Sequence, residues 1–490
     1  MAIEVQEGTP TPASTPEPPS VALVVDLDGT LTPADTLHEG LVKLLKAYPF
    51  DALRLPAWLG SGKARFKREV AARAPLDVSL LPYDGLVLDR LRAARAAGRR
   101  TVLATASDAA VAHAIAEHLG LFDEVIASDG DNNLSGVRKR DALVARFGER
   151  GFDYMANAAA DKPVWSAART AILINASPAL SADMRNGHED VENASQSAGF
   201  FRTLIEAARL YQWVKNVLIF VPILAAQQFS GASLLQAGLA FLFFGMASSS
   251  VYLLNDAMDL EADRRHPRKR QRPFASGRLA LLPGLLSAAV LMIASLIGAF
   301  AVGAQFAVVL AAYLIVTSSY SLWIKRYPLI DVIVLAGLYT LRIIAGGAAT
   351  DTPLSLWLLA FAMFLFASLA FAKRYAELAE VFSRGESSID GRGYQAGDQD
   401  VLMALGTAAG MASVVTLALF VNNPTDPDLY GTPELLWGVC PVLLFWVAHI
   451  WLAAQRGVLT DDPIVFAFSD MASRAALVIA LIPVGLAIWL

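Results

Sequence analysis

Long apolar segments in the second half of the chain constrain the fold most strongly. The chain has 490 residues, of which 55% are hydrophobic, but the apolar residues are unevenly distributed. Up to about residue 205 they are mixed with charged residues as in a soluble domain. Beyond it, segments of roughly 18–24 apolar residues recur, and each is long enough to cross a hydrocarbon core about 30 Å thick. The sequence therefore predicts a two-part chain, with a soluble domain followed by an all-α membrane bundle.

We expect nine transmembrane helices in residues 205–490, and the charges between them predict their orientation. The expected spans are 212–229, 234–254, 281–302, 305–322, 329–346, 354–372, 401–421, 433–453 and 472–490. Basic residues crowd the segments after the second, fourth and sixth spans, whereas the opposite segments are short or acidic. By the positive-inside rule, the N-terminal domain and the basic segments face the cytoplasm. We expect a multi-pass protein of a bacterial inner membrane, surrounded by membrane lipids.

Charge and cysteine content exclude several classes of function. The net charge of −5 gives no reason to expect a nucleic-acid partner. Cys440 is the single cysteine, so neither an intrachain disulfide nor a cysteine-based metal site is expected. Residues 1–20 are rich in Pro, Ser and Thr and are expected to form a disordered tail. A homo-oligomer is compatible with the sequence.

The N-terminal half predicts an α/β domain over residues 21–181. Short β-branched runs, among them "VALVV" from Val21 and "AILINAS" from Ala171, alternate with amphipathic helical stretches. This alternation is typical of a parallel sheet covered by helices. Residues 37–80 interrupt it, and we expect them to form a small helical cap inserted after the first strand. The polar segment 182–204 is expected to link this domain to the membrane bundle, residues 205–490.

A cluster of carboxylates follows the second apolar span. In "NDAMDLEAD", Asn255, Asp259 and Asp263 are spaced i, i+4 and i+8, which places them on one face of a helix, with Asp256 beside them. Carboxylates this close repel one another unless a cation lies between them, and Mg²⁺ prefers such oxygen ligands. The basic residues that follow could bind a phosphate or diphosphate. The pattern predicts a Mg²⁺ site that activates a diphosphate leaving group, although basic residues here could also serve only to fix the topology.

The motif resembles the first Asp-rich motif of the UbiA-type intramembrane transferases. The segments "QWVKNVLIFVPIL", "YSLWIKRYPLIDV", "LRIIAGG", "FAKRYAEL" and "DDPIVFAFSD" are similar, in matching order, to the decaprenyl-phosphate phosphoribosyltransferase group. The superfamily usually carries a second motif, D-x-x-x-D, but here Asp331 is followed four residues later by Leu335. The resemblance implies a UbiA fold of nine helices and a donor with more negative charge than a prenyl diphosphate.

The resemblance implies a transferase that moves phosphoribose from phosphoribosyl diphosphate (PRPP) to a polyprenyl phosphate lipid, with Mg²⁺ as cofactor. The metal-binding and catalytic residues would be Asn255, Asp256, Asp259, Asp263 and, for catalysis, Asp331. The substrate's negative charges would be bound by Lys215, Asn216, Arg264, Arg265, Lys269, Arg272, Tyr320, Lys325, Arg342, Lys373 and Arg374. Arg342 lies inside an apolar run, where an unpaired charge is costly, so it is expected to have a functional partner or an ion-pair partner on another helix.

Two other functions remain open for the membrane half. A prenyltransferase that moves an isoprenoid from its diphosphate to an aromatic acceptor uses the same diphosphate chemistry, but it is expected to carry the second aspartate pair. The other possibility is a transporter or scaffold whose soluble domain senses phosphate esters. Transporters often show internal repeats. The Asp-rich motif at the cytoplasmic end of a helix disfavours this last class.

The string "VALVVDLDGTLT" resembles the first motif of haloacid dehalogenase (HAD)-type phosphatases. In that family the first aspartate, here Asp26, attacks phosphorus, and the second, here Asp28, serves as acid and base. Thr105 in "VLATASD" matches the motif that binds the phosphoryl group, and Lys139 in "SGVRKRDAL" matches the charge-stabilising lysine. The resemblance implies a HAD-like Rossmannoid α/β domain with a small helical cap.

The fourth HAD motif departs from the family pattern. Near "FDYMANAAADKPVW" the pattern would be G-D-x-x-x-D, but Ala156 and Asn157 replace Gly-Asp, while Asp161 remains. The Mg²⁺ ligands implied by the resemblance are then Asp26, Asp28, Asn157 and Asp161. A neutral amide is a weaker Mg²⁺ ligand than a carboxylate. Two alternatives follow: a phosphatase that removes the 5-phosphate of the transferase product, or a domain without turnover that keeps a structural role.

Overall fold

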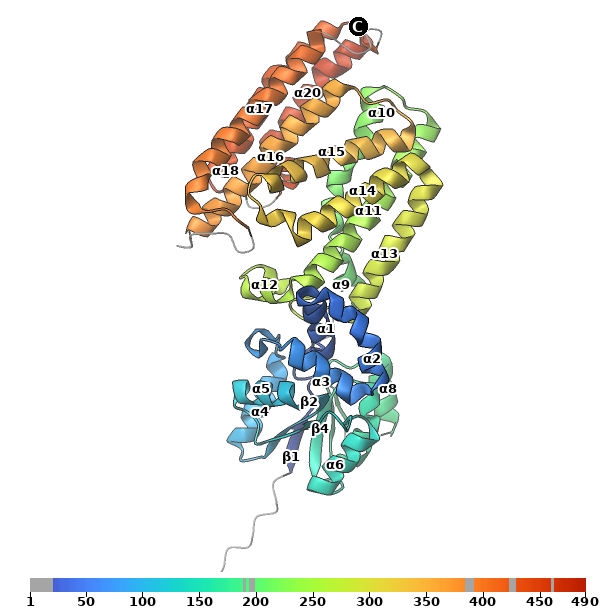
Figure 1. Ribbon diagram of the computed structural model, residues 1–490, viewed down its shortest axis with the longest axis vertical. Helices are drawn as coiled ribbons and strands as arrows, with labels where there is room; N and C mark the ends of the chain where they lie inside the picture. Colours follow the sequence, from blue (N-terminus) through green and yellow to red (C-terminus); the bar gives the residue numbers. More distant parts are fainter. Residues whose placement is uncertain (1–20, 188–190, 194–198, 384–391, 423–428, 460–461) are drawn as a thin grey trace, which may run out of the picture. The chain divides into compact units, whose positions relative to one another are not determined.

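The protein folds as two compact units, shown in a computed structural model that describes residues 21–187, 191–193, 199–383, 392–422, 429–459 and 462–490 (Figure 1). The first unit comprises residues 1–204 with 256–284, and the second comprises residues 205–255 with 285–490. The expected N-terminal tail, residues 1–20, lies outside the described residues.

The first unit is built on a parallel sheet with strand order β3-β2-β1-β4-β5-β6. Its strands are β1 (Ala22–Val25), β2 (Thr101–Asp108), β3 (Glu124–Ser128), β4 (Phe152–Ala156), β5 (Ala171–Leu173) and β6 (Val191–Asn193). In such a sheet the chain proceeds outward from β1 in both directions, so a crevice opens at the carboxyl ends of β1 and β4. Asp26 and Asn157 directly follow these two strands and therefore lie at the crevice.

Helices cover the sheet, and a small cap follows β1. The helices of this unit are α1 (Thr36–Ala47), α2 (Leu55–Gly60), α3 (Lys63–Arg73), α4 (Gly85–Ala96), α5 (Ala109–Leu119), α6 (Val137–Phe147), α7 (Lys162–Ala167), α8 (Pro178–Gly187) and α12 (Leu260–Arg265). Asp35 caps α1 by accepting from the backbone amide of His38. Leu44 of α1 packs against Val70 and Ala74 of the α3 segment in a core of the cap's own. The cap expected over residues 37–80 is confirmed as helices α1–α3.

The segment expected to be a linker carries regular structure. Helix α8 extends to Gly187, and β6 pairs in parallel with β5, with Val191 opposite Ala171. Arg90 of α4 forms an ion pair with Glu192 of β6. The polar composition of residues 182–204 concealed this strand, because an edge strand of three residues gives almost no hydrophobic periodicity.

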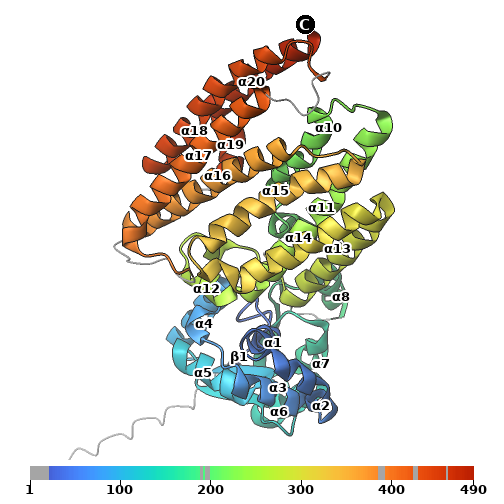
Figure 2. The same ribbon diagram turned by 45° about the horizontal axis from the view of Figure 1, so that its top comes forward.

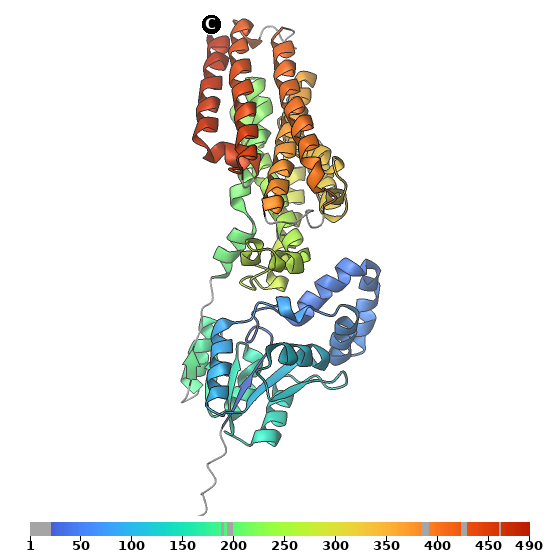
Figure 3. The same ribbon diagram turned by 90° about the vertical axis from the view of Figure 1, so that its left-hand side faces the viewer.

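The second unit is a helical bundle. Its helices are α9 (Phe200–Ala207), which begins in the first unit, α10 (Val221–Ala225), α11 (Gly231–Met258), α13 (Leu281–Val302), α14 (Ala304–Leu322), α15 (Ile330–Thr350), α16 (Leu356–Ser383), α17 (Gln399–Asn422), α18 (Val439–Gln455), α19 (Pro463–Ser469) and α20 (Met471–Trp489). The long helices run roughly alongside one another, as Figures 2 and 3 show. Within the described residues, eight helices are long and apolar enough to span a membrane. The first of the nine expected spans corresponds to a shorter apolar segment, Leu210–Ala225, which is a 3₁₀ helix followed by α10.

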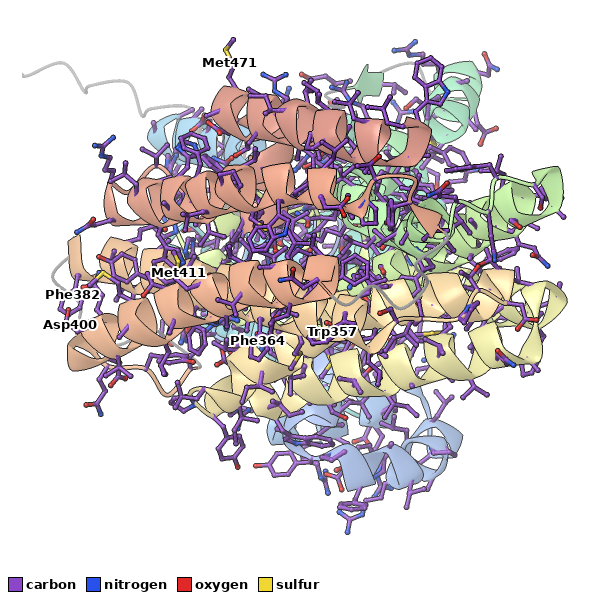
Figure 4. The ribbon with its side chains drawn as sticks, turned by 90° about the horizontal axis from the view of Figure 1, so that it is seen from above. Trp357, Phe364, Phe382, Asp400, Met411 and Met471 are labelled. Carbon is purple, nitrogen blue, oxygen red and sulfur yellow. The ribbon has the colours of Figure 1, made fainter. Side chains whose placement is uncertain are left out.

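Small residues allow α17 to pack closely against its neighbours. A Cβ atom at Gly406 would lie 2.1 Å from the ring of Trp451 in α18, and one at Gly410 would lie 2.5 Å from Val447. Glycines four residues apart on one helix face are typical of close helix packing in membranes. Large apolar side chains cover the outside, including Phe364, Met411 and Met471, and Met471 points away from the helices in Figure 4. An outer surface of this kind suits a hydrocarbon environment.

Candidate functional sites

Asp26 lies in a buried polar cluster at the end of β1. The ammonium of Lys139 in α6 donates to Asp26 Oδ1 at 2.8 Å and to Asp161 Oδ1 at 3.1 Å. The hydroxyl of Tyr154 in β4 donates to Asp161 Oδ1 at 2.9 Å. All four side chains are buried. The fold thus brings together three of the predicted HAD residues, although Asp26 and Lys139 are 113 positions apart.

Asp28 is held by the cap and by the end of β2. Its Oδ1 accepts from the backbone amide of Thr36 at 2.7 Å, and its Oδ2 accepts from the hydroxyl of Ser107. The hydroxyls of Thr36 and Ser107 are themselves 3.0 Å apart. Thr105 is buried on the same strand, and its hydroxyl accepts from the amide of Ser107 at 3.0 Å. The side chain of Asp28 is therefore fixed by groups from two different elements.

Burial raises the pKa of both aspartates. The pKa of Asp26 rises to about 7 because the carboxyl is buried, although the ammonium of Lys139 opposes the shift. The pKa of Asp28 is raised by burial and by the charge of Asp35, while its hydrogen bonds with Ser107 and Thr36 oppose the rise. For Asp28, a raised pKa allows the carboxyl to carry a proton closer to neutral pH, which a general acid must do.

Asn157 packs directly on the turn that carries Asp28. Gly29 has a φ of +78°, and a Cβ atom there would lie 2.0 Å from Nδ2 of Asn157. Glycine is needed at this turn both for its backbone conformation and for the close approach of the amide. Asp161 is already bonded to Lys139 and Tyr154.

A Mg²⁺ at this edge of the sheet would be held by the carboxylates of Asp26 and Asp161, which both pair with Lys139 through one oxygen, and by the amide of Asn157. Mg²⁺ commonly keeps several waters and takes further oxygens from a substrate phosphate. The donor set fits an ion held chiefly together with its substrate.

The Asp-rich motif lies where one helix ends and another begins. Helix α11 ends at Met258, and Asp259 precedes α12, so the single helix expected through Asp263 is interrupted. The two carboxylates that come together are Asp256 and Asp263. Arg272 Nη1 lies 2.8 Å from Asp263 Oδ2 and 3.2 Å from Asp256 Oδ1.

The guanidinium of Arg272 occupies the position that a metal ion between these carboxylates would take. Both carboxylates are buried, and burial raises the pKa of Asp263 although Arg272 opposes the shift. Two buried carboxylates that already share one cation offer the oxygen ligands that Mg²⁺ prefers. This donor set fits a divalent cation.

Other residues of the Asp-rich segment bond to the cap helix α1 within the first unit. Arg264 Nη1 donates to Glu39 at 2.8 Å, and both side chains are 6% exposed. Lys46 forms an ion pair with Asp259 at 3.1 Å. Arg264, predicted to bind substrate, therefore has a carboxylate partner.

The remaining predicted residues of this stretch are more exposed. Arg265 lies 3.4 Å from Asp77, and Lys269 is exposed at the start of a 3₁₀ turn, Lys269–Gln271. Asn255, which belongs to the second unit, donates from Nδ2 to the hydroxyl of Ser321 at 2.9 Å.

Inside the second unit, two lysines share one carboxylate. Lys215 Nζ lies 2.8 Å from Asp462 Oδ2, Lys373 Nζ lies 3.2 Å from the same oxygen, and the hydroxyl of Tyr339 donates to it at 2.6 Å. Burial opposes ionisation of Asp462, but Lys215 and Lys373 hold its pKa well below the usual range. Asp462 also caps α19. The predicted pair Lys215 and Lys373 is thus brought together by an acid that we did not predict as a site residue.

Arg342 lies in an aromatic cage next to this group. Its guanidinium carbon is 5.1 Å from the ring centroids of both Phe244 and Tyr313. Its Nε donates to Asn216 Oδ1 at 3.1 Å and its Nη1 donates to the carbonyl of Leu338 at 2.7 Å. Nδ2 of Asn216 is buried without a partner in the described part of the chain. A buried polar donor without a partner is costly, so it is suited to meet a ligand.

Asp331 is completely buried in an ion pair. Arg374 Nε donates to Asp331 Oδ2 at 2.6 Å, and the two side chains are 1% and 0% exposed. Arg374 also bonds to Glu377 at 2.7 Å and to the hydroxyl of Tyr320, while the hydroxyl of Tyr394 donates to Asp331. This group connects the predicted residues Tyr320, Asp331 and Arg374.

Arg392 and Lys325 are two further basic residues of this unit. Arg392 Nη1 lies 3.3 Å from the hydroxyl of Tyr320 and 3.5 Å from Asp331. Lys325 lies in a 3₁₀ turn, Ile324–Arg326, between α14 and α15. The polar side chains of the bundle thus form cation-rich groups with few carboxylates.

Comparison with known proteins identifies both halves of the chain. Residues 216–468 match the UbiA prenyltransferase family, and residues 23–151 match haloacid dehalogenase-like hydrolases. The chain belongs to the UbiA prenyltransferase family. It is an integral membrane protein with a UbiA domain at its C-terminal side and a HAD-like domain at its N-terminal side.

Relatives match either most of this chain or a little over half of it. An uncharacterized protein of Sinorhizobium fredii, y4nM, is 38% identical over 92% of this chain and 88% of its own length. The nodulation protein NoeC of Azorhizobium caulinodans is 36% identical over 56% of this chain and 89% of its own length. The decaprenyl-phosphate phosphoribosyltransferase of Mycolicibacterium smegmatis is 31% identical over 58% of this chain and 92% of its own length.

Several residues of these groups are not predicted as site residues from the sequence. Tyr154 is a tyrosine within an apolar strand, and that isolated hydroxyl was its one signal. Ser107, Tyr339 and Arg392 gave none, because their partners are distant in sequence. Asp462 stood in the quoted segment "DDPIVFAFSD", but its role depends on Lys215, which lies 247 positions away.

Proposed function

We propose that the UbiA domain transfers 5-phosphoribose from PRPP to a polyprenyl phosphate in a Mg²⁺-dependent reaction. The relative named decaprenyl-phosphate phosphoribosyltransferase, which aligns over nearly its whole length, supports the choice of reaction. The observation that carries the proposal is the buried pairing of Asp331 with Arg374. Arg374 is 1% exposed and also bonded to Glu377, unlike the 29% exposed Arg272. Asp331 is therefore not free to hold a second metal, whereas the cation-rich interior suits a donor with a 5-phosphate as well as a diphosphate.

The acceptor also suits these groups. A polyprenyl phosphate is a lipid-borne anion, and Lys215, Lys373 and Arg342 together carry more positive charge than Asp462 neutralises. Buried charges need a partner in a medium of low dielectric constant. The amide of Asn216, whose Nδ2 has no partner among the described residues, adds a neutral hydrogen bond for the same anion.

In the proposed reaction, Asp256 and Asp263 would hold the metal, and Arg272, which now pairs with them, would be free to bind the diphosphate. Bound Mg²⁺ supplies charge neutralisation at the leaving diphosphate. An anionic oxygen of the lipid phosphate attacks C1 of the ribose, the bond from C1 to the diphosphate oxygen breaks, and diphosphate leaves. A strong general base is not required, because a phosphate monoester is already largely ionised near neutral pH.

The test measures diphosphate released from PRPP by the full chain in lipid nanodiscs, with and without polyprenyl phosphate. We expect release that requires both Mg²⁺ and the acceptor, and a lipid product that carries ribose 5-phosphate. A parallel reaction with a prenyl diphosphate and an aromatic acid tests the alternative prenyltransferase. Release in that reaction, with none from PRPP, would refute the proposed donor.

We further propose that the HAD-like domain hydrolyses the 5-phosphate of the transferred group. Support comes from the intact arrangement of Asp26, Asp28, Lys139 and Asp161 despite the change at Asn157. Asp26 attacks phosphorus, the ester bond breaks as Asp28 protonates the leaving oxygen, and water then hydrolyses the aspartyl phosphate with Asp28 as base. A phosphatase on the same chain meets its partner's product at high effective concentration.

The coupled reaction tests this second role. In a reaction with PRPP labelled in its 5-phosphate, the full chain is expected to release labelled phosphate, and Asp26→Asn is expected to leave the label on the lipid. If the Asp26→Asn product is the same as that of the wild type, the domain has a structural role instead.

The proposed topology places the HAD-like domain and the basic segments on the cytoplasmic side of a bacterial inner membrane. The cationic segment from Arg264 to Arg272 supports this orientation through the positive-inside rule. Protease treatment of spheroplasts and of inverted vesicles tests it. Cleavage within residues 21–187 is expected only in the inverted vesicles.

A further inference from the structure

The cap of the HAD-like domain places one cation inside the phosphatase site. Helix α3 carries five basic residues, Lys63, Arg65, Lys67, Arg68 and Arg73. Three of them, Lys63, Arg65 and Arg68, are exposed. Lys67 turns inward, and its ammonium donates to the carbonyl of Ala106 at 2.6 Å and to Asn133 Oδ1 at 3.2 Å. Ala106 stands between Thr105 and Ser107 at the end of β2.

The partners of Lys67 are neutral. Both acceptors are uncharged oxygens, and no carboxylate lies within 4.0 Å of its ammonium among the residues that the structure describes. The carboxylates of Asp28 and Asp35 act on it only at longer range. A partly buried ammonium without a counter-ion is costly, which suggests that its anionic partner belongs to a ligand.

Lys67 lies on the side of the site where the alcohol part of a substrate must leave. Asp28 protonates the oxygen of the departing alcohol, so that alcohol lies beyond Asp28 as seen from Asp26. Thr36 and Ser107, the residues that hold Asp28, line a small cavity there, together with Lys67 and Asp108. Val70 of the cap and Val111 of α5 form part of its apolar wall. The cavity thus begins beside Asp28, the proton donor, and the side chain of Lys67 lines it.

We propose that Lys67 binds a second anionic group on the alcohol part of the phosphatase substrate. The site then selects phosphomonoesters of sugars that carry another phosphoryl group, and it disfavours simple sugar monophosphates. This inference rests on the proposed phosphatase function. It agrees with the proposed transferase product, in which ribose carries its 5-phosphate and a phosphodiester at C1.

A pair of soluble substrates isolates the second charge. Ribose 5-phosphate and ribose 1,5-bisphosphate share the phosphoester to be cleaved, but only the second carries an anion at C1. For Lys67→Gln in the full chain, we expect KM for the bisphosphate to rise about 10- to 100-fold, the range for loss of a charge-assisted hydrogen bond. The kcat/KM for ribose 5-phosphate is expected to stay within about threefold, and Lys67→Arg is expected to restore most of the preference.

Arg65→Gln, on the exposed side of the same helix, is the matched control and should leave both substrates unchanged. Glutamine keeps hydrogen-bond donors for Ala106 and Asn133, so Lys67→Gln separates charge from cap positioning. An equal loss on both substrates, or no loss on either, overturns the inference.

Binding distinguishes failure of the subsite from failure of the phosphatase. If the wild type hydrolyses neither compound, the phosphatase proposal is wrong, and titration calorimetry of the full chain with ribose 1,5-bisphosphate still decides the subsite. Weaker binding to Lys67→Gln by about tenfold or more supports it, while equal binding to both proteins overturns it.

Discussion

Lys139→Met probes whether the HAD-like domain depends on its buried ion-pair cluster. The side chain of Lys139 is 3% exposed and pairs with Asp26 and Asp161, which are 9% and 6% exposed. Methionine has a similar volume but no charge, so two buried carboxylates remain without a cation. Removing one partner of a buried ion pair costs about 3–5 kcal/mol in the free energy of unfolding.

The cost is expected to depend on pH. Burial already raises the pKa of Asp26 to about 7 with Lys139 in place. Replacing Lys139 with methionine removes the positive charge that opposes this rise. A carboxyl whose folded-state pKa exceeds its unfolded value binds protons more tightly in the folded state, so the folded state gains stability as pH falls. The variant is therefore expected to lose more stability at pH 8 than at pH 5.5.

Hydrogen exchange of peptides from β1 and β4, measured in the full chain, reports the stability of this domain locally. Lys162→Met, which breaks the exposed pair with Asp183, is the control and should cost less than about 1 kcal/mol. Lys139→Met/Asp161→Asn should recover part of the loss, because it leaves one carboxylate that can protonate. If Lys139→Met costs no more than the control, the reasoning from burial is wrong.

Four further predictions concern single residues. Asn157→Asp adds a carboxylate at the end of β4 and should lower the Mg²⁺ concentration for half-maximal phosphatase activity about tenfold, whereas an unchanged titration would remove Asn157 from the metal site. Asp263→Asn should reduce diphosphate release from PRPP at least about 100-fold and raise the Mg²⁺ required, while release as fast as in the wild type would exclude this acid as a ligand. Asp462→Asn leaves two lysines without their shared carboxylate and should raise KM for the lipid acceptor or lower kcat by about tenfold, measured with size-exclusion chromatography as the folding control. The hydrogen bond to Asp35 raises the pKa of His38, so their pairing stabilises the fold below about pH 6.5 and is lost as pH rises through the folded-state pKa. His38→Asn should therefore lower the free energy of unfolding more at pH 5.5 than at pH 8.5. The loss should stay below about 1 kcal/mol because the pair is partly exposed.

Local patterns predicted the elements of the fold well where periodicity was strong. The two architectures, the cap after β1 and eight of the nine expected apolar spans were confirmed in the described residues, because each is encoded by residues that are neighbours in sequence. The first span differs in form, since Leu210–Ala225 is a 3₁₀ helix followed by a short α-helix. The break at Asp259 was missed because spacing alone does not reveal where a helix ends.

The partners of the predicted site residues were harder to foresee. Arg272 was assigned to substrate from its charge, yet in the structure it bridges Asp256 and Asp263. Arg374 was assigned in the same way, yet it is buried against Asp331. Charge in a sequence indicates that a partner exists, but it does not say whether that partner is a ligand or another side chain.

The sequence by itself determined that this chain has a HAD-like α/β domain and a membrane bundle. Hydrophobic periodicity and short motifs carry that information locally. Only the tertiary structure decided that Lys67 turns inward beside Asp28, and that Lys215 and Lys373 share Asp462. Such contacts join residues tens to hundreds of positions apart, and burial removes the water that would otherwise satisfy their charges, so packing determines which groups must pair.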